Sequence, residues 1–255
     1  MYILGINAYH GDASACIFKN EELIAATEEE RILRVKHWAG FPCESIKFCL
    51  EEAGIDITQV DHITIARDPS ANILKKVAHV LKNLASIDAA KDRLLNRKKI
   101  SNLAKDFSSC FGIKESSITA KIHNIEHHRS HMASAFFASP FEESAVLSID
   151  AFGDFTSTML GKGTGNKINV ESQVNFPHSV GAFYTAFTQY LGFNHFGDEY
   201  KLMGLSPYGS PTMLKQVRDA VIFKNDGLFE LNLDYFTHHI KGVKTKIMSK
   251  SDPTP

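Results

Sequence analysis

The first residues of the chain alternate short apolar runs with polar turns. Residues 2–7, 13–18 and 22–27 have the composition of strands, and residues 10–12 and 19–21 between them have that of turns. Strands joined by such short turns pair with their neighbours in the chain. The pattern therefore predicts an antiparallel meander of three strands at the N-terminus.

A helix and a buried strand follow the meander. Pro42 suits the first turn of a helix, Ile46 and Leu50 share one helical face, and Gly54 supplies the usual left-handed stop. Residues 62–66 are an apolar run of strand length. Strands, then a helix, then a strand is the order typical of one lobe of a nucleotide-binding α/β domain.

Residues 71–111 have apolar positions at helical spacing with basic residues between them. We interpret this segment as an inserted helical hairpin with a solvated basic face. A nucleic-acid patch is disfavoured, because interleaved aromatic residues are missing from this stretch and the chain has no basic excess. A strand at 120–124 and a helix at 126–137 are predicted to follow.

An internal repeat is the most informative feature of the sequence. Residues 4–14 align with residues 147–156 across one gap, and both copies read as a strand, a Gly-Asp turn and a strand. The second copy continues into strands at 157–161 and 168–173, which rebuilds the meander. Two Gly-Asp turns can also match by chance, but the match extends into the flanking strands. We therefore predict an α/β fold of the actin, sugar-kinase and Hsp70 type (ASKHA), with duplicated ribonuclease-H-like lobes.

The predicted domains are a first lobe at 1–140, with a helical insertion at about 71–111, and the start of a second lobe at 141–255. After the second meander the pattern predicts a helix at 180–191, a glycine-rich loop at 203–209 and a short helix from Pro211. A complete lobe needs a further helix and strands. We therefore expect the chain to be the front portion of a longer protein.

Composition limits the classes of partner. The formal net charge is -1, which gives no general attraction to nucleic acid or to a membrane surface. No apolar run approaches the roughly 20 residues that span a bilayer. The four cysteines form no CxxC pair and have apolar or helical surroundings, which is typical of reduced core thiols. We expect a cytoplasmic protein without nucleic-acid or membrane partners.

His127 and His131 are the candidate metal ligands. They lie at positions i and i+4 of a predicted helix, so both imidazoles can reach one ion. A carboxylate must complete the site, and Asp150 or a residue beyond Pro255 could supply it. Such a set favours iron or zinc over calcium. The alternative is a pair of solvated or hydrogen-bonded histidines.

The two repeated turns carry a second candidate chemistry. Asp12 and Asp154 each follow a glycine, where a carboxylate can meet a magnesium-bound phosphate while backbone amides, such as that of Gly153, cradle the oxygens. His10, present only in the first copy, could act as a general base towards a hydroxyl. Ordinary turn chemistry accounts for the same residues without any ligand.

Two further segments could contact an anionic substrate. A charged stretch after the third strand contains Arg31, Arg34 and Lys36, although a solvated face would look the same. Residues 176–181 and 197–209 together resemble a substrate loop that carries Glu199 and Lys201. The residues expected to meet a cofactor or its phosphates are Lys36, Asp150, Gly153, Asp154, Glu199 and Lys201.

In combination these segments resemble the NodU/CmcH carbamoyltransferases. The resemblance runs from residue 2 to about residue 210, and its segments follow the order found in the family: residues 3–14, 28–31, 34–37, 127–136, 176–179 and 201–209. It implies a Kae1-like N-terminal domain on the ASKHA fold, with a YrdC-like domain downstream in the full-length protein.

The resemblance also implies an activity. Such enzymes use carbamoyl phosphate and ATP with magnesium to form carbamoyl adenylate, and then pass the carbamoyl group to a hydroxyl of a small-molecule or sugar acceptor. His127 and His131 match the family's metal pair, whose remaining carboxylate ligand lies further along the chain. Asp12 and His10 match the loop near the reacting carbamoyl group, although Gly11 separates them here. The resemblance therefore implies that this chain alone does not carry out the complete reaction.

Two alternatives stay open at this stage. One is a sugar or acid kinase, or a Kae1-like threonylcarbamoyl transferase, on the same fold. The other is a non-catalytic actin-like module, against which metal or nucleotide binding would count. The pattern specifies neither the particular acceptor nor an oligomeric state.

Overall fold

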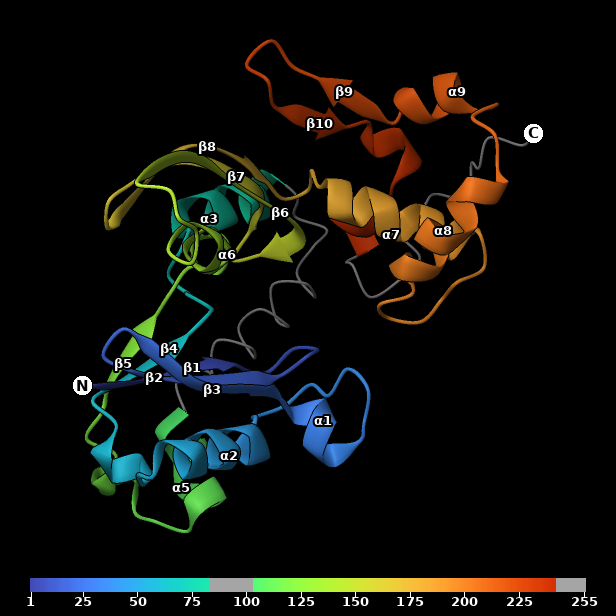
Figure 1. Cartoon of the computed structure of the whole chain (residues 1–255). Coiled ribbons are helices and arrows are strands. Elements are labelled where there is room, and N and C mark those ends of the chain that lie inside the picture. Colours follow the sequence, from blue (N-terminus) through green and yellow to red (C-terminus); the bar gives the residue numbers. More distant parts are fainter. Residues whose placement is uncertain (83–102, 242–255) are drawn as a thin grey trace. The chain divides into compact units, whose positions relative to one another are not determined.

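A computed structural model describes residues 1–82 and 103–241 of the chain, which divide into two compact units (Figure 1). Unit 1 contains the described residues 1–69 and 103–126, and unit 2 contains 70–82 and 127–241. The predicted boundary at residue 140 therefore falls inside unit 2. The reason is that helix α6 (His127–Phe136) packs on strands of unit 2.

Unit 1 is built on a five-stranded sheet in the order β3-β2-β1-β4-β5. The first three strands form the predicted antiparallel meander, and β4 and β5 run parallel to β1. This is the strand order of a ribonuclease-H-like lobe, and it confirms the predicted fold class. The strands are β1 (Tyr2–Asn7), β2 (Ser14–Lys19), β3 (Glu22–Glu28), β4 (His62–Ile65) and β5 (Lys121–Asn124).

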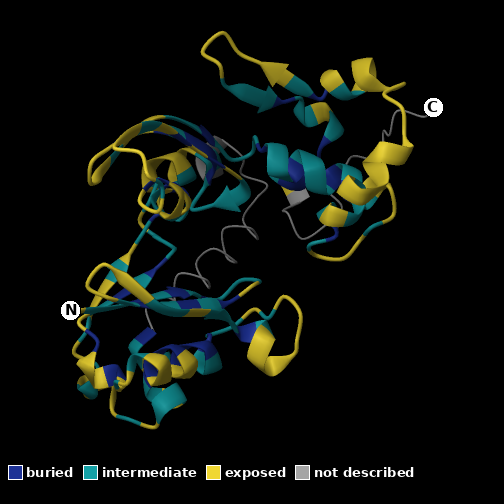
Figure 2. Ribbon diagram, viewed as in Figure 1, coloured by how far each residue is buried: buried dark blue, intermediate teal, exposed yellow. Residues whose placement is uncertain are grey.

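Helices α2 (Cys43–Ala53) and α5 (Leu103–Phe111) cover one face of this sheet (Figure 1). Helix α2 ends at Gly54, whose φ of 64° is the predicted left-handed stop. Apolar side chains of the two helices and of the sheet share one core, and Figure 2 shows the buried residues gathered there. Unit 1 also contains α1 (Glu29–Leu33) and short 3-10 turns at Ile57–Gln59 and Glu115–Ser117.

The predicted insertion at 71–111 is divided between the two units. Helix α3 (Ile73–Lys82) belongs to unit 2, whereas α5 belongs to unit 1. Leu103 and Phe107 of α5 are buried in the core, so this helix is not part of a solvated hairpin. Residues 83–102 of the predicted insertion lie outside the described part of the chain.

Unit 2 contains the second meander, as the repeat predicted. Strands β6 (Glu143–Gly153), β7 (Thr156–Thr164) and β8 (Lys167–Asn175) form an antiparallel sheet in that order. Helix α6 packs on β6 and β7 through Met132 and Phe136, which share a core with Val146 and Met159. Helix α7 (Val180–Tyr190) also packs on β6.

The described residues after α7 form short helices, 3-10 turns and one hairpin. The elements are α8 (Glu199–Leu205), a 3-10 turn at Ser206–Tyr208, α9 (Leu214–Arg218), the hairpin strands β9 (Val221–Phe223) and β10 (Phe229–Leu231), a 3-10 turn at Leu233–Tyr235 and α10 (His238–Lys241). The prediction of a glycine-rich loop at 203–209 is therefore wrong. Gly204 lies inside α8, where one glycine among leucine and methionine weakens the helix without ending it.

Cysteine pairing differs from the prediction of four reduced thiols. Cys43 and Cys110 form a disulfide between the start of α2 and the end of α5, whereas Cys16 and Cys49 are free. The two partners are 67 positions apart, so only the packing of α5 beside α2 brings them together.

Within residues 1–82 and 103–241, no helix combines the length and apolar character of a bilayer span. The cytoplasmic location rested partly on reduced thiols and stays a prediction.

Candidate metal centre

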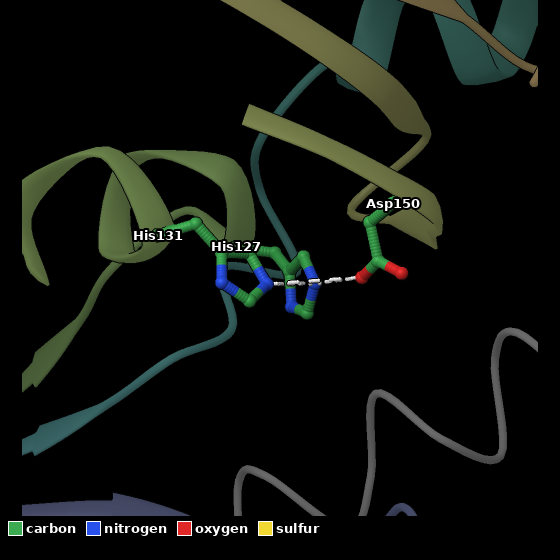
Figure 3. Close-up of side chains that lie close together, drawn as sticks. All are labelled: His127, His131 and Asp150. Atoms are coloured by element: carbon green, nitrogen blue, oxygen red, sulfur yellow. Dashed lines mark hydrogen bonds and ion pairs between the residues drawn. The ribbon is translucent and has the colours of Figure 1, made fainter. Parts of the chain in front are cut away.

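Three side chains of unit 2 converge at the start of α6 (Figure 3). Nε2 of His127 lies 2.8 Å from Oδ2 of Asp150, near the end of β6. Nε2 of His131 lies 3.1 Å from Nε2 of His127 and 3.7 Å from the same carboxylate oxygen. The helix therefore brings its two histidines together as predicted, and β6 supplies the carboxylate.

These separations fit a transition-metal ion. Ligand atoms about 2.1 Å from one ion lie roughly 3.0–3.4 Å apart in octahedral or tetrahedral geometry. The three observed distances bracket that interval, so an ion fits between the donors after shifts of a few tenths of an ångström. Two imidazoles and one carboxylate are a donor set for iron or zinc rather than for calcium.

The electrostatics also favour a cation at this position. The hydrogen bond from His127, and next the nearby His131 ring, hold the pKa of Asp150 well below its usual range, so its carboxylate is ionised. The amide of Ala151 donates to Oδ1 at 2.6 Å, which leaves Oδ2 directed at the imidazoles. The His127 side chain is 17% exposed and that of His131 is 53% exposed, so the cluster opens to solvent at His131.

The turn between β6 and β7 fixes the first residue of α6. The amide of His127 donates to Oδ2 of Asp154 at 3.1 Å, so this carboxylate caps the helix from another element. Asp154 and Phe155 have positive φ values of 48° and 79°, which allow the tight turn. Asp154 thus has a structural partner, and its expected contact with magnesium-bound phosphate stays a prediction.

His128, which the sequence analysis did not single out, attaches α6 to the sheet. Its ring is fully buried, with Nδ1 2.8 Å from Oγ of Ser148 and Nε2 3.0 Å from the carbonyl oxygen of Thr156. Burial lowers the pKa of His128 to about 4, so the ring is neutral. The sequence offered one signal for this role. His128 directly follows a candidate ligand, and adjacent helix residues point in different directions, so His128 faces away from the side on which His127 lies.

Gly153 has a steric role at this centre. A Cβ at this position would lie 2.0 Å from Cδ2 and 2.1 Å from Cγ of His127. The absence of a side chain therefore makes room for the imidazole. Its expected contact with a cofactor stays a prediction.

The N-terminus of α7 supports Asp150 from the other side. Oγ of Ser179 accepts from the amide of Ala182, which caps α7, and donates to the carbonyl oxygen of Asp150 at 3.0 Å. A Cβ on Gly181 would lie 2.6 Å from the amide nitrogen of Ala151, so α7 approaches the strand backbone closely. The predicted substrate segment 176–181 thus has a clear supporting role.

The predicted site in unit 1 has a different arrangement. Asp12 pairs with His37, whose Nδ1 lies 2.8 Å from Oδ1, and Oε2 of Glu30 accepts from the His37 amide at 2.9 Å. His10 instead lies with Nδ1 3.1 Å from the carbonyl oxygen of Gly11. The structure does not pair Asp12 with His10, and the sequence analysis missed His37 although it ends a matched segment. Lys36 is exposed beside it.

Asp12, Glu30 and His37 form a second group of possible ligands, with donor atoms within 4.8 Å of one another. Their polar atoms already bond within the group, so ordinary hydrogen bonding accounts for the arrangement.

Glu199 and Lys201 lie on α8 and have partners close by. Oε1 of Glu199 accepts from Oγ1 of Thr185 at 2.6 Å, and Nζ of Lys201 lies 2.6 Å from a carboxylate oxygen of Asp198. The first contact joins α8 to α7. These two residues therefore stand on a helix rather than on the predicted loop.

A repeated ribonuclease-H-like meander with a His-His-Asp centre on the second copy defines an ASKHA-type α/β protein. The family model described as "Carbamoyltransferase N-terminus" matches residues 2–250. The chain therefore belongs to the carbamoyltransferase family and corresponds to its N-terminal portion.

Relatives with curated sequences agree with this membership. "Uncharacterized protein sll1178" of Synechocystis sp. is 40% identical over 93% of this chain and 40% of its own length. "Nodulation protein NolNO" of Sinorhizobium fredii is 35% identical over 80% of this chain and 29% of its own length. The chain thus spans well under half of each of these relatives.

Solved structures give weaker similarities. YeaZ from Pseudomonas aeruginosa is 10% identical, with a TM-score of 0.34 over 69% of each chain. The ROK hexokinase from Thermus thermophilus is 12% identical, with a TM-score of 0.39 over 84% of this chain and 72% of the hexokinase. The fold assignment rests on the strand order and on the repeated meander.

Proposed function

We propose that this chain is the metal-bearing front portion of an O-carbamoyltransferase. The convergence of His127, His131 and Asp150 carries the proposal, because it provides an ionised, partly exposed donor set in a member of this family. The proposed donor is carbamoyl phosphate, activated with ATP and magnesium to carbamoyl adenylate. The proposed acceptor is a hydroxyl of a small molecule or sugar.

The proposed transfer step forms one bond and breaks one bond. The acceptor oxygen attacks the carbamoyl carbon, the bond from that carbon to the AMP phosphate oxygen breaks, and the electron pair leaves with AMP. The hydroxyl proton passes to a base. An iron or zinc ion held by His127, His131 and Asp150 would supply positive charge to the phosphate group.

The residues of this chain have defined tasks in the proposal. Asp150 stays ionised because its two histidine partners stabilise the charged form. The cap from Asp154 and the buried ring of His128 orient the first turn of α6. The remaining nucleotide pocket and the YrdC-like domain would come from the part of the relatives that this chain does not cover, so we expect the chain alone to lack the complete reaction.

Metal content of the purified chain tests this proposal. After reconstitution with iron(II) or zinc, elemental analysis should find about one ion per chain, and His127→Ala/His131→Ala should lose it. Asp150→Asn keeps both imidazoles but removes the carboxylate, so it should weaken metal binding.

The matched control is His62→Ala/His123→Ala. These two rings also lie close together, with nitrogen atoms 2.9 Å apart on β4 and β5 of unit 1, and they belong to neither three-ligand group of the described residues. Equal metal content in the control and the wild type would assign the ion to α6. Equal loss in both double variants, or no ion in the wild type, would refute the metal centre.

A further inference from the structure

Asn72 lies at the start of α3, in the segment 70–82 that belongs to unit 2 although it directly follows unit 1 in the chain. Its carbonyl oxygen accepts the amide of Lys76, so Asn72 is the N-cap residue that precedes the helix. Its φ of 55° is left-handed, a conformation that asparagine and glycine adopt more easily than other residues. The side chain is therefore directed by an unusual backbone geometry.

The Asn72 amide group bonds three partners in the second meander. Nδ2 donates to the carbonyl oxygen of Asp154 and to Oγ1 of Thr156, both at 3.1 Å. Oδ1 accepts from Nε2 of Gln173 on β8 at 3.2 Å. Nε2 of Gln173 also lies 2.7 Å from Oδ1 of Asn175. Both donor hydrogens and the acceptor oxygen of this one amide are thus used.

The two residues that Asn72 holds are the residues that orient α6. Asp154 accepts the amide of His127, and the carbonyl of Thr156 meets the buried ring of His128. Thr156 is fully buried, so its hydroxyl has no water to replace the asparagine amide. A change at Asn72 therefore reaches His127 through the turn at Asp154, without any contact between Asn72 and the ligands.

We propose that Asn72 is a positioning residue of the His127–His131–Asp150 centre, acting through the β6–β7 turn. The inference rests on the metal centre proposed above and adds the N-terminus of α3 to its supporting structure. Partners in this outer layer commonly change metal affinity 10- to 100-fold when they are removed. Nothing in the sequence pattern of residues 71–111 indicated such a role.

Asn72→Gly separates the effect of the side-chain amide from the effect of the backbone conformation. Glycine keeps the left-handed φ at no steric cost, so the variant removes only the side-chain bonds. Asn20→Gly is the matched control, since Asn20 also has a left-handed φ, of 56°, and lies in the β2–β3 turn of unit 1. Both variants carry the same chemical change, and only one of them touches the meander of unit 2.

Cobalt(II) is the probe, because its visible absorption reports ligand geometry and its affinity can be measured against a chelator. We expect Asn72→Gly to bind cobalt about 10- to 100-fold more weakly, with an altered visible spectrum. Asn20→Gly should match the wild type in both. Wild-type affinity and spectrum in Asn72→Gly would overturn the proposal and leave the metal centre itself intact.

Two further measurements cover the other outcomes. If Asn72→Gly does not fold, Gln173→Ala is the substitute, because it removes one bond from the same amide. It should give a smaller loss of cobalt affinity, and unchanged affinity would overturn the role.

If the wild type binds no cobalt, the metal centre fails, and the positioning role is read from the imidazole NMR signals of His127 and His128. Signals that Asn72→Gly leaves unchanged would then overturn it.

Discussion

At the residue scale, the candidate metal centre depends on a glycine that leaves room for one of its histidines. His127 packs its ring over Gly153, where any Cβ would occupy the space of the imidazole. Two carbons of the ring lie within 2.1 Å of that position, far inside normal contact distance. The glycine of the Gly-Asp turn is therefore needed for the ligand as much as for the turn.

We expect Gly153→Ala to lower metal affinity by at least about tenfold, because the methyl group must push the His127 ring away from Asp150. The measurement is cobalt or zinc affinity by chelator competition, with circular dichroism to establish that the variant folds. The backbone of Gly153 is a strand residue without positive φ, so the effect should come from the contact itself.

Gly204→Ala is the control for this substitution. Gly204 lies in α8, and a Cβ there would have no neighbour within 4 Å. The control should keep wild-type metal affinity and gain slightly in helix stability. A Gly153→Ala protein that binds metal as tightly as this control would contradict the steric role.

At the element scale, α2 is capped by a residue from another helix. Pro42 precedes α2 and has no side-chain acceptor, whereas the buried carboxylate of Glu29 accepts the amides of Glu44 and Ser45 at 3.0 and 2.7 Å. These amides belong to the first turn, where a helix has no internal acceptors. One residue of the charged stretch is therefore a structural cap.

Glu29→Ala should destabilise unit 1 by about 1–2 kcal/mol, the usual range for losing a helix cap. Trp38 is the only tryptophan of the chain and lies in unit 1, so its fluorescence during urea unfolding reports on this unit. Glu28→Ala, which removes an exposed partner of Arg31, should change stability far less. Equal unfolding curves for the two variants would rule out the capping role.

At the scale of the whole molecule, the disulfide links segments that are distant in the chain. Cys43 and Cys110 close a loop of 67 positions within unit 1. A cross-link of this length restricts the unfolded chain, and the entropy model gives about 4 kcal/mol of stabilisation. The stability of unit 1 should therefore depend on the redox state.

We expect a reducing agent to lower the urea midpoint reported by Trp38, with a loss on the order of 4 kcal/mol. Cys43→Ser/Cys110→Ser should be equally unstable with and without the reductant. Cys16→Ala, which changes a free thiol, should keep the wild-type response. Four titratable thiols in the unreduced native protein would contradict the disulfide.

The sequence by itself determined the two meanders, most of the helices next to them and the histidine pair. Strand alternation, the stop at Gly54 and the repeated Gly-Asp turn are local patterns. Their effect depends on neighbouring residues in the chain and not on where the segment lies in the fold. The i, i+4 spacing of His127 and His131 follows from helix geometry alone, so their approach was predictable. Family membership followed from the order of the matched segments.

The tertiary structure decided which distant groups meet. Asp150 became the third member of the cluster because the packing of α6 on β6 brings it there, whereas the sequence left residues beyond Pro255 as alternatives. The Asp12–His37 pair, the Cys43–Cys110 bond and the contact of Gly153 with His127 likewise join residues far apart in the chain. Such pairings depend on how whole elements pack, and that packing is fixed by the sum of many weak contacts rather than by a local motif.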